Sequence, residues 1–288
     1  MTDKSKLSTE PYKGVRDFYP EDMAVQNYIF DTWKKVAKSF GYEEYSASLL
    51  EPAELYENKS SSEIVNEQMF TFMDRGDRKV ALRPEMTPSL ARMVAGRYKS
   101  LKFPIRWFSI PNVFRYERPQ RGRKREHWQL NCDIVGIADI SAEVEAISMA
   151  YQIMKIFGAK DSDCEVRIND RGLLNEKFNN PELIKLLDKK EKMPSEEFEK
   201  KWQEISGKEF DNNIEPNENI NSILKKLEEK EIKNVVFNPT ITRGFDYYTG
   251  MVFEVFDTSP ENNRSLFGGG RYDNLLEIFG VEPIPTVG

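Results

Sequence analysis

The sequence contains few residues of the kinds that build metal and redox sites. Among its 288 residues are two cysteines, Cys132 and Cys164, and one histidine, His127. The cysteines match no metal-ligand or redox spacing, and a single histidine excludes a histidine-rich metal site. We therefore expect no metal centre built from these residues. The low cysteine content also favours a reducing compartment over a secreted, disulfide-stabilised protein.

The sequence also lacks long apolar runs and any excess of positive charge. No stretch approaches the roughly 20 consecutive apolar residues that a membrane-spanning helix needs, and the leading segment MTDKSKLSTE is polar, unlike a signal peptide. The net charge of −6 argues against non-specific coating of nucleic acid. With 39% apolar residues, the chain has enough core material for one large domain or two ordinary ones. We expect a cytoplasmic protein without membrane contact.

The stretch Asn112–Val135, with the sequence NVFRYERPQRGRKREHWQLNCDIV, reads as strand, basic loop and strand. Because side chains alternate along a strand, Arg115 and Glu117 are expected to face away from Phe114 and Tyr116. The second strand, His127–Ile134, has an apolar face and a polar face, and the polar face consists of His127, Gln129, Asn131 and Asp133. The pattern predicts a sheet with one packed face and one face that presents hydrogen-bonding groups.

The loop between these two strands is strongly cationic. Its basic residues, with no apolar residue among them, are Arg118, Arg121, Arg123, Lys124 and Arg125. Arginine binds phosphate oxygens in a bidentate geometry, so a polyanionic ligand lying along the polar face of the sheet fits this composition. The alternative is a surface hairpin with a solvated, charged tip. The ordered polar row on the second strand favours a binding site.

The segment LRPEMT (Leu82–Thr87) places a carboxylate and a hydroxyl two residues apart. In extended chain, Glu85 and Thr87 point the same way, and together they suit an ammonium group. The alternative is that Thr87 is the N-cap of the helix that we expect at Pro88–Gly96.

Two segments near the end of the chain combine strand patterns with unusual residues. In ITRGFDYYTGMVFEVF (Ile241–Phe256), apolar side chains on both faces predict a central strand, which is preceded by Arg243, Asp246, Tyr247 and Tyr248. In SLFGGGRYD (Ser265–Asp273), three consecutive glycines permit a ligand or another strand to approach the backbone closely. A flexible loop is the alternative for the glycine segment.

The remaining patterns are structural. Apolar residues at helical spacing predict core-packing helices at Glu21–Phe40 and Ser141–Gly158. The segments Met69–Asp74 and Lys79–Pro84 predict a hairpin. From Asn175 to Lys233, Lys and Glu dominate, and we expect a small helical insertion that is stabilised by charge pairs and set apart from the core. Such a composition is more typical of a solvated spacer than of a functional surface.

Together these segments resemble histidyl-tRNA synthetase, a class II aminoacyl-tRNA synthetase, from Gly14 to Gly288 and most weakly in the helical insertion. Arg115–Gln120, with the strand through Asp133, resembles class II motif 2, which alone indicates only the class. The segments RGFDYYTG (Arg243–Gly250) and GGGRYD resemble the two histidine-specific motifs of the family. LRPEMT precedes these three segments in the chain, which is the order that the family has.

The resemblance implies an α+β fold in which an antiparallel sheet is flanked by helices, and not a Rossmann fold. It implies a class II catalytic domain made of residues 1–170 and 234–288, split by the helical insertion at 171–233. It also implies a homodimer formed through motif 1, at Tyr42–Glu51.

The resemblance further implies a ligase reaction in two steps. The carboxylate of L-histidine attacks the α-phosphate of Mg²⁺-ATP, which gives histidyl-adenylate and pyrophosphate. The histidyl group then passes to the terminal ribose of tRNA(His). Negative charge builds on the α-phosphate during the attack, so fixed cations lower the barrier effectively.

For the ATP side, the resemblance implies that Arg115 grips the α-phosphate and that Arg243 is a catalytic cation on the opposite side, between carboxylate and phosphate. It also implies that Glu117 lies in the ATP pocket, that Arg123 lies near the outer phosphates and that His127 stacks on adenine.

For the amino-acid side, it implies that Glu85, Thr87 and Gln129 hold the α-amino and carboxylate ends of histidine. The imidazole is recognised by Asp133, Tyr247 and Tyr248. A site that hydrogen-bonds a polar side chain strongly rejects analogues that lack it, so this set suits selection of histidine without editing.

Three features depart from the family pattern. Ser48 stands where motif 1 usually has a proline, which bears on the expected dimer contact. His127 stands where the family usually has an aromatic residue. The chain stops at Gly288, where motif 3 opens in the family, so we expect a catalytic fragment without the motif 3 arginine and without the anticodon-binding domain. Such a fragment is expected to bind ATP more weakly and to discriminate tRNA poorly.

Other readings remain. The regulatory subunit of ATP phosphoribosyltransferase shares the fold and binds histidine as a signal, but such paralogues tend to lose charged residues that this sequence keeps, namely Arg115, Glu117, Arg123 and Arg243. Another class II synthetase is disfavoured by the paired tyrosines after Arg243-Gly244. A purely structural module does not explain a polar row on a central strand.

Overall fold

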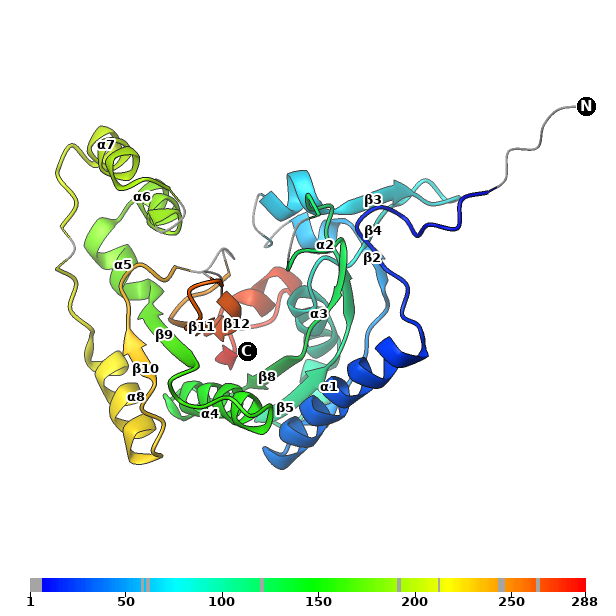
Figure 1. Ribbon diagram of the computed structural model, residues 1–288, viewed down its shortest axis with the longest axis horizontal. Coiled ribbons are helices and arrows are strands. Elements are labelled where there is room, and N and C mark those ends of the chain that lie inside the picture. The colour runs from blue at the N-terminus through cyan, green and yellow to red at the C-terminus, as the bar shows by residue number, and fades with distance from the viewer. Residues whose placement is uncertain are drawn as a thin grey trace, which may run out of the picture.

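A mostly antiparallel sheet forms the centre of the computed structural model (Figure 1). The structure describes residues 7–57, 60, 63–119, 122–190, 193–211, 213–242, 247–262 and 265–288. One half of the sheet has the strand order β1 (Glu43–Glu44), β5 (Ile105–Ser109), β8 (Asn131–Val135) and β13 (Thr286–Val287). The other half has the order β10 (Val235–Phe237), β9 (Cys164–Asp170), β11 (Met251–Asp257) and β12 (Ser265–Gly270).

Backbone hydrogen bonds at the end of β12 join the two halves. The amide of Gly270 donates to the carbonyl of Gly288 at 2.8 Å, and the amide of Gly288 donates back at 3.1 Å. Within these strands the two parallel pairs are β1 with β5 and β9 with β10. The α+β class with an antiparallel sheet flanked by helices is therefore confirmed, and β11 is the central strand that the sequence predicts.

The two faces of this sheet bury different sets of side chains. Helices α1 (Pro20–Ser39), α4 (Ser141–Ile156) and α8 (Glu218–Glu229) cover one face, which receives Cys132 and Ile134 of β8. The other face packs against α3 (Thr87–Arg97) and the short helix η4 (Leu275–Phe279), and it receives Val135. Because side chains alternate along β8, Asp133 lies on this second face. The helices predicted at Glu21–Phe40 and Ser141–Gly158 are confirmed as α1 and α4.

Two smaller sheets lie beside the central one. In the first, β4 (Lys79–Leu82) pairs with β2 (Leu50–Pro52) and β3 (Phe70–Met73), which confirms the predicted hairpin. In the second, β6 (Asn112–Phe114) pairs with β7 (Glu126–Trp128). Short helices complete this region and are α2 (Glu54–Glu57), the π-helix η1 (Ile64–Gln68) and the 3-10 helix η2 (Tyr98–Ser100).

The prediction of one continuous strand over His127–Ile134 is wrong in one respect. The segment forms β7 and β8, which belong to different sheets and are separated by Gln129 and Leu130. The chain breaks there because β7 pairs with β6, while β8 turns to pair with β5. The alternation survives the break, since Leu130 and Cys132 still pack against the helical core.

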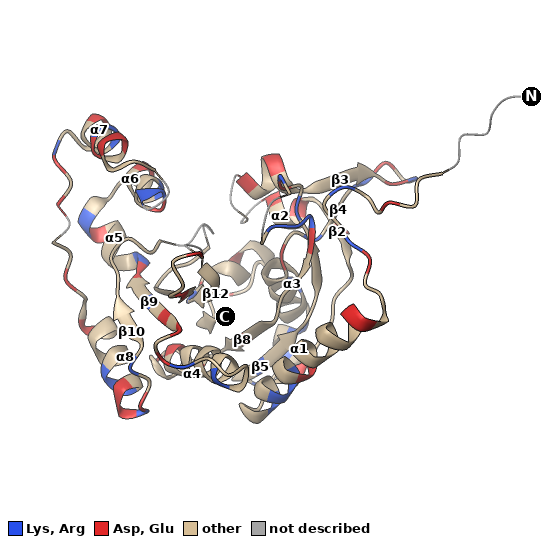
Figure 2. Cartoon of the chain, viewed as in Figure 1, with Lys and Arg blue, Asp and Glu red and all other residues tan. Residues whose placement is uncertain are grey.

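Helices α5 (Arg171–Phe178), α6 (Pro181–Leu187) and α7 (Ser195–Ser206) have a core of their own, which includes Leu174, Leu187, Phe198 and Trp202. Figure 1 places α6 and α7 at one end of the molecule and β3 at the other. Helix α8 instead buries Ile220, Ile223 and Leu227 in the main core. Charges of both signs lie on α7 and α8 (Figure 2). The division at 171–233 stays a prediction.

In the described part of the chain, no helix combines the length and the apolar character that crossing a membrane requires.

Candidate active site

The arginine that follows β6 is fixed at the edge of the second face. Arg115 Nε donates to the carbonyl of Pro84 at 2.9 Å, and its amide donates to the carbonyl of Arg125 at 2.9 Å. The neighbouring Arg83 is buried and donates to the carbonyl of Asn112 at 2.8 Å and to the carbonyl of Ala47 at 2.9 Å. These bonds tie motif 2 and the segment before β2 to LRPEMT, so Arg115 is held beside Glu85.

Two basic residues of the cationic loop, Arg123 and Arg125, contact other residues of the same chain. Arg123 Nη1 lies 3.1 Å from Glu117 Oε2 in an ion pair, so these two predicted ATP-binding residues contact each other. Arg125 is buried, donates to the hydroxyl of Tyr12 at 2.9 Å and stacks over the ring of Tyr116 at 3.7 Å. Arg125, to which the sequence assigned no individual role, therefore anchors the N-terminal segment. Arg121 lies outside the described residues.

His127 and Gln129 lie next to each other on the polar side of the hairpin. Gln129 Nε2 is 3.3 Å from His127 Nε2, at hydrogen-bond distance. Burial, and then the nearby charge of Arg115, lower the pKa of His127 to about 4. The imidazole is therefore neutral at pH 7, which suits stacking better than proton transfer.

The carboxylate of Glu85 is buried and held from two directions. The hydroxyl of Tyr247 donates to Oε2 at 3.1 Å, and the hydroxyl of Ser60 makes a short hydrogen bond to Oε1. The prediction that Thr87 caps the following helix is wrong, because α3 begins at Thr87 itself. The backbone of Met86 is helical, so the extended-chain argument for Glu85 and Thr87 does not hold.

Asp133 lies on the second face of the central sheet, where it contacts a cluster of tyrosines. The hydroxyl of Tyr272 makes a short hydrogen bond to Asp133 Oδ1, and both residues are buried. The ring centroid of Tyr247 lies 4.9 Å from that of Tyr248 and 5.5 Å from that of Tyr272. Burial raises the pKa of Asp133 to about 7, while the hydrogen bond from Tyr272 acts in the opposite direction.

These contacts connect five of the predicted site residues, namely Arg115, Glu85, Tyr247, Tyr248 and Asp133. A path of hydrogen bonds and ring contacts runs from Arg115 through Pro84 and Glu85 to Tyr247, and from there to Tyr272 and Asp133. Arg243 and Asp246 lie outside the described residues. Sequence reasoning missed Tyr272 as a partner of Asp133, although GGGRYD contains it, and it missed Ser60 and Arg83.

The glycines of GGGRYD allow other atoms to approach the backbone closely, which is the first of the two predictions for this segment. A Cβ at Gly270 would lie 2.5 Å from the carbonyl oxygen of Met251 and 2.9 Å from Cδ1 of Tyr248. The segment is strand β12, so the alternative of a flexible loop is wrong.

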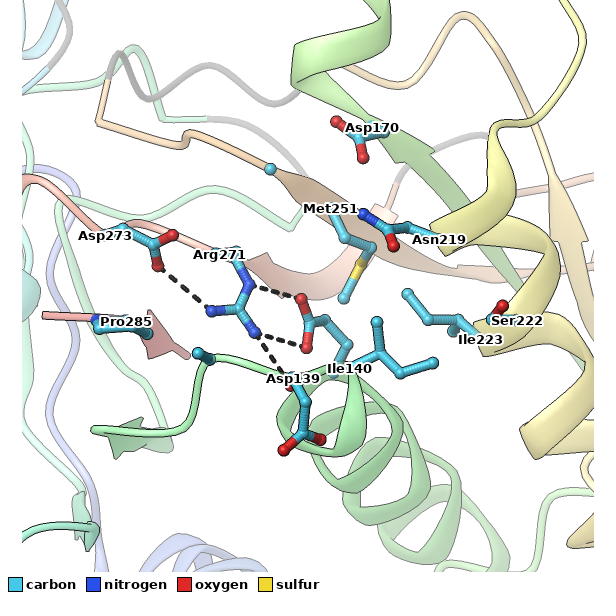
Figure 3. Close-up of a pocket in the computed structure, with 13 residues that line it drawn as sticks. Asp139, Ile140, Asp170, Asn219, Ser222, Ile223, Met251, Arg271, Asp273 and Pro285 are labelled. Carbon is cyan, nitrogen blue, oxygen red and sulfur yellow. Dashed lines mark hydrogen bonds and ion pairs between the residues drawn. The ribbon is translucent and has the colours of Figure 1, made fainter.

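A cavity of about 410 Å³ lies on the helical side of the sheet (Figure 3). Its wall includes Arg271, whose guanidinium pairs in a bidentate manner with Glu143 at 2.6 and 2.7 Å. Arg271 and Tyr272 are adjacent, and Figure 3 shows Arg271 directed to α4, whereas Tyr272 contacts Asp133. None of the predicted site residues lines this cavity. Its Arg271–Glu143 pair secures α4 against the sheet.

Comparisons with known proteins agree with this arrangement. The family model described as histidyl-tRNA synthetase matches residues 14–179 and 171–288. A histidine–tRNA ligase of Leptospira biflexa is 45% identical over 99% of this chain and 72% of its own length. A histidine–tRNA ligase of Haloarcula marismortui is 37% identical over 96% of this chain and 71% of its own length.

Two solved structures share the fold. A protein of Bacillus halodurans described as an ATP phosphoribosyltransferase regulatory subunit/histidyl-tRNA synthetase superposes with a TM-score of 0.78 at 24% identity, covering 98% of this chain and 80% of that chain. The apo histidyl-tRNA synthetase of S. aureus gives a TM-score of 0.72 at 24% identity, covering 98% and 70%. From the family match and the 45% identity to a relative, this chain belongs to the histidyl-tRNA synthetase family.

Proposed function

We propose that this chain activates L-histidine with ATP to histidyl-adenylate and transfers the histidyl group to tRNA(His). The relatives from Leptospira biflexa and Haloarcula marismortui carry the name histidine–tRNA ligase, which supports a ligase. The observation that carries the proposal is the hydrogen bond from Tyr247 to Glu85, because it joins a histidine-specific motif to the segment that anchors Arg115.

On the ATP side, Arg115 binds the α-phosphate and stabilises the charge that develops there during attack by the carboxylate. Arg243 supplies the second cation at this phosphorus. Glu117 and Arg123 exchange their mutual ion pair for contacts with the nucleotide, and neutral His127 stacks on adenine. Mg²⁺ enters with ATP as part of the substrate.

On the histidine side, buried Glu85 accepts hydrogen bonds from the α-ammonium group, with Thr87 and Gln129 beside it. Asp133 and the rings of Tyr247 and Tyr248 bind the imidazole. The hydroxyl of Tyr272 donates to Oδ1 of Asp133, which makes Oδ2 the second acceptor of this carboxylate. We assign the imidazole N–H to Oδ2.

Histidine-dependent exchange of pyrophosphate into ATP tests this function, run in parallel with other amino acids. Exchange with histidine alone is expected. If the chain binds histidine by calorimetry but catalyses no exchange, while a full-length relative exchanges in the same assay, the histidine-sensing alternative is favoured over the ligase.

We also propose a homodimer and a cytoplasmic location. Exposed apolar side chains on β2 and β3, namely Leu50, Phe72 and Met73, support an interface near motif 1. The carboxylate of Glu51 instead pairs with Arg92 of the same chain at 2.7 Å. Sedimentation equilibrium of the wild type and of Leu50→Asp tests the dimer. The free thiols of Cys132 and Cys164 support a reducing compartment.

A further inference from the structure

Three polar side chains, Tyr45, Ser109 and Asn131, form a row on the face that carries Asp133. Ser109 lies opposite Asn131 in the β5–β8 register, and Trp107 lies opposite Asp133. Residues directly opposite in neighbouring strands share a face of the sheet, so Ser109, Asn131 and Asp133 face the same side. Tyr45 follows β1, and its amide donates to the carbonyl of Phe108 at 2.8 Å, which puts Tyr45 beside Ser109.

Tyr45, Ser109 and Asn131 each have a buried polar atom whose hydrogen-bonding capacity the described residues do not fill, although the hydroxyls of Tyr45 and Ser109 also interact with each other. These atoms are Tyr45 Oη, Ser109 Oγ and Asn131 Nδ2. Ser109 as a whole is only 3% exposed. Folded proteins rarely leave several such groups together without a hydrogen-bond partner. These three atoms could therefore be satisfied together by hydrogen bonds to one small polar molecule.

The row is close to the predicted imidazole site. The ring of Tyr45 packs against Trp107 with centroids 5.7 Å apart. Burial and then the charge of Asp133 raise the pKa of Tyr45 well above its usual value, while an interaction with the hydroxyl of Ser109 acts in the opposite direction. Tyr45 likewise contributes to the raised pKa of Tyr272, the hydroxyl that binds Asp133. The row is thus near enough to the Asp133–Tyr272 pair to act on it electrostatically.

We propose that Tyr45, Ser109 and Asn131 bind an ordered water beside Asp133, and that through this water they position its carboxylate for the imidazole of histidine. The assignment of histidine rests on the proposed function. The hydrogen bonds balance, because Asn131 Nδ2 donates to the water, the hydroxyls donate or accept, and the water donates to the carboxylate. Water is the fitting occupant, since one molecule makes two to four hydrogen bonds in a buried polar site.

Kinetics of pyrophosphate exchange test the positioning role. We expect Ser109→Ala and Asn131→Ala each to raise KM for histidine about 10-fold, the equivalent of one hydrogen bond, with KM for ATP and kcat within about twofold of wild type. Ser148→Ala is the matched control, because this partly buried hydroxyl donates to the carbonyl of Val144 at 2.6 Å on the other face. An unchanged KM for histidine in both variants, or an equal rise in both KM values, would overturn the positioning role.

The stability of Tyr45→Phe tests the water independently of catalysis. Removing a buried hydroxyl that binds nothing is neutral or stabilising, whereas removing one that binds an ordered water is destabilising. We expect a lower Tm than wild type, and a crystal structure with a water within about 3.2 Å of Ser109 Oγ and Asn131 Nδ2. An equal or higher Tm, or no such water, would sink the proposal. If the water is present but wild type catalyses no exchange, the proposed function fails and the water site stands.

Discussion

Tyr247 donates a hydrogen bond to Glu85 at 3.1 Å, across 162 residues of sequence. Both side chains are buried, so this contact fixes how the C-terminal tyrosine motif lies against LRPEMT. Glu85 follows Pro84, whose carbonyl accepts from Arg115. The hydrogen bond therefore sets the spacing between the expected ammonium-binding carboxylate and the arginine of motif 2.

Removing this hydrogen bond is expected to weaken histidine binding. Tyr247→Phe keeps the ring but leaves Glu85 with one donor fewer, and hydrogen bonds to charged groups contribute about 1.5–3 kcal/mol. We expect KM for histidine to rise about tenfold or more, measured by pyrophosphate exchange. Tyr151→Phe is the control, because it removes an exposed tyrosine–carboxylate bond of 2.9 Å to Asp161. Equal effects in the two variants would count against a role for Tyr247 in the site.

The raised pKa of Asp133 predicts a pH-dependent stability. With a folded-state pKa of about 7 and an ordinary unfolded value, the folded state binds the proton of Asp133 more tightly, so the contribution of Asp133 to stability is fully present below about pH 4 and is lost as pH rises through 7. Asp133→Asn carries no such loss. Urea unfolding at several pH values should show that the free energy of unfolding of the variant rises relative to that of wild type between pH 4 and 7. Above this range the difference between the two should stay constant. A constant difference across this range would contradict the burial argument.

The close approach at β12 predicts a sharp difference between two glycines. Gly270→Ala places a Cβ 2.5 Å from the carbonyl oxygen of Met251, so the backbone must shift, and we expect a loss of about 2 kcal/mol or more of stability. Gly96→Ala in α3 meets no atom within 4 Å and is expected to be neutral or stabilising. Chemical denaturation of both variants checks this. The close-packing account is wrong if Gly270→Ala is as stable as Gly96→Ala.

The ion pair between Arg271 and Glu143 predicts a contrast on one helix. Glu143→Ala leaves a buried guanidinium without its bidentate partner, and breaking such a pair costs about 3–5 kcal/mol. Glu145→Ala, two positions along α4, removes a more exposed pair with Arg106 and should cost about 1 kcal/mol or less. Thermal unfolding of both variants provides the comparison. Similar losses would mean that burial of the Arg271 pair matters little.

The sequence predicted the fold where local pattern and tertiary packing agree. Alternation along β11 and β8 assigned the buried faces correctly, because each strand packs an apolar side against the helices. The break between β7 and β8 was not visible, since it depends on pairing with strands distant in sequence. The role of Arg125 was missed for a similar reason, because its partner Tyr12 lies far away at the start of the chain.

Tyr272 shows a different limit. Its motif was recognised, yet only the geometry reveals that its hydroxyl contacts Asp133 rather than solvent. The start of α3 at Thr87 likewise depends on the helical backbone of Met86, which the local sequence pattern did not indicate.

The most direct test of the central claim is pyrophosphate exchange by wild type, Arg115→Ala and Arg243→Ala, with Arg97→Ala on the exposed end of α3 as control. Far-UV circular dichroism confirms that each variant is folded. We predict exchange that depends on histidine alone, is retained in Arg97→Ala and is abolished in the other two folded variants. Near-normal exchange in either Arg115→Ala or Arg243→Ala, or exchange driven equally by another amino acid, would contradict the account.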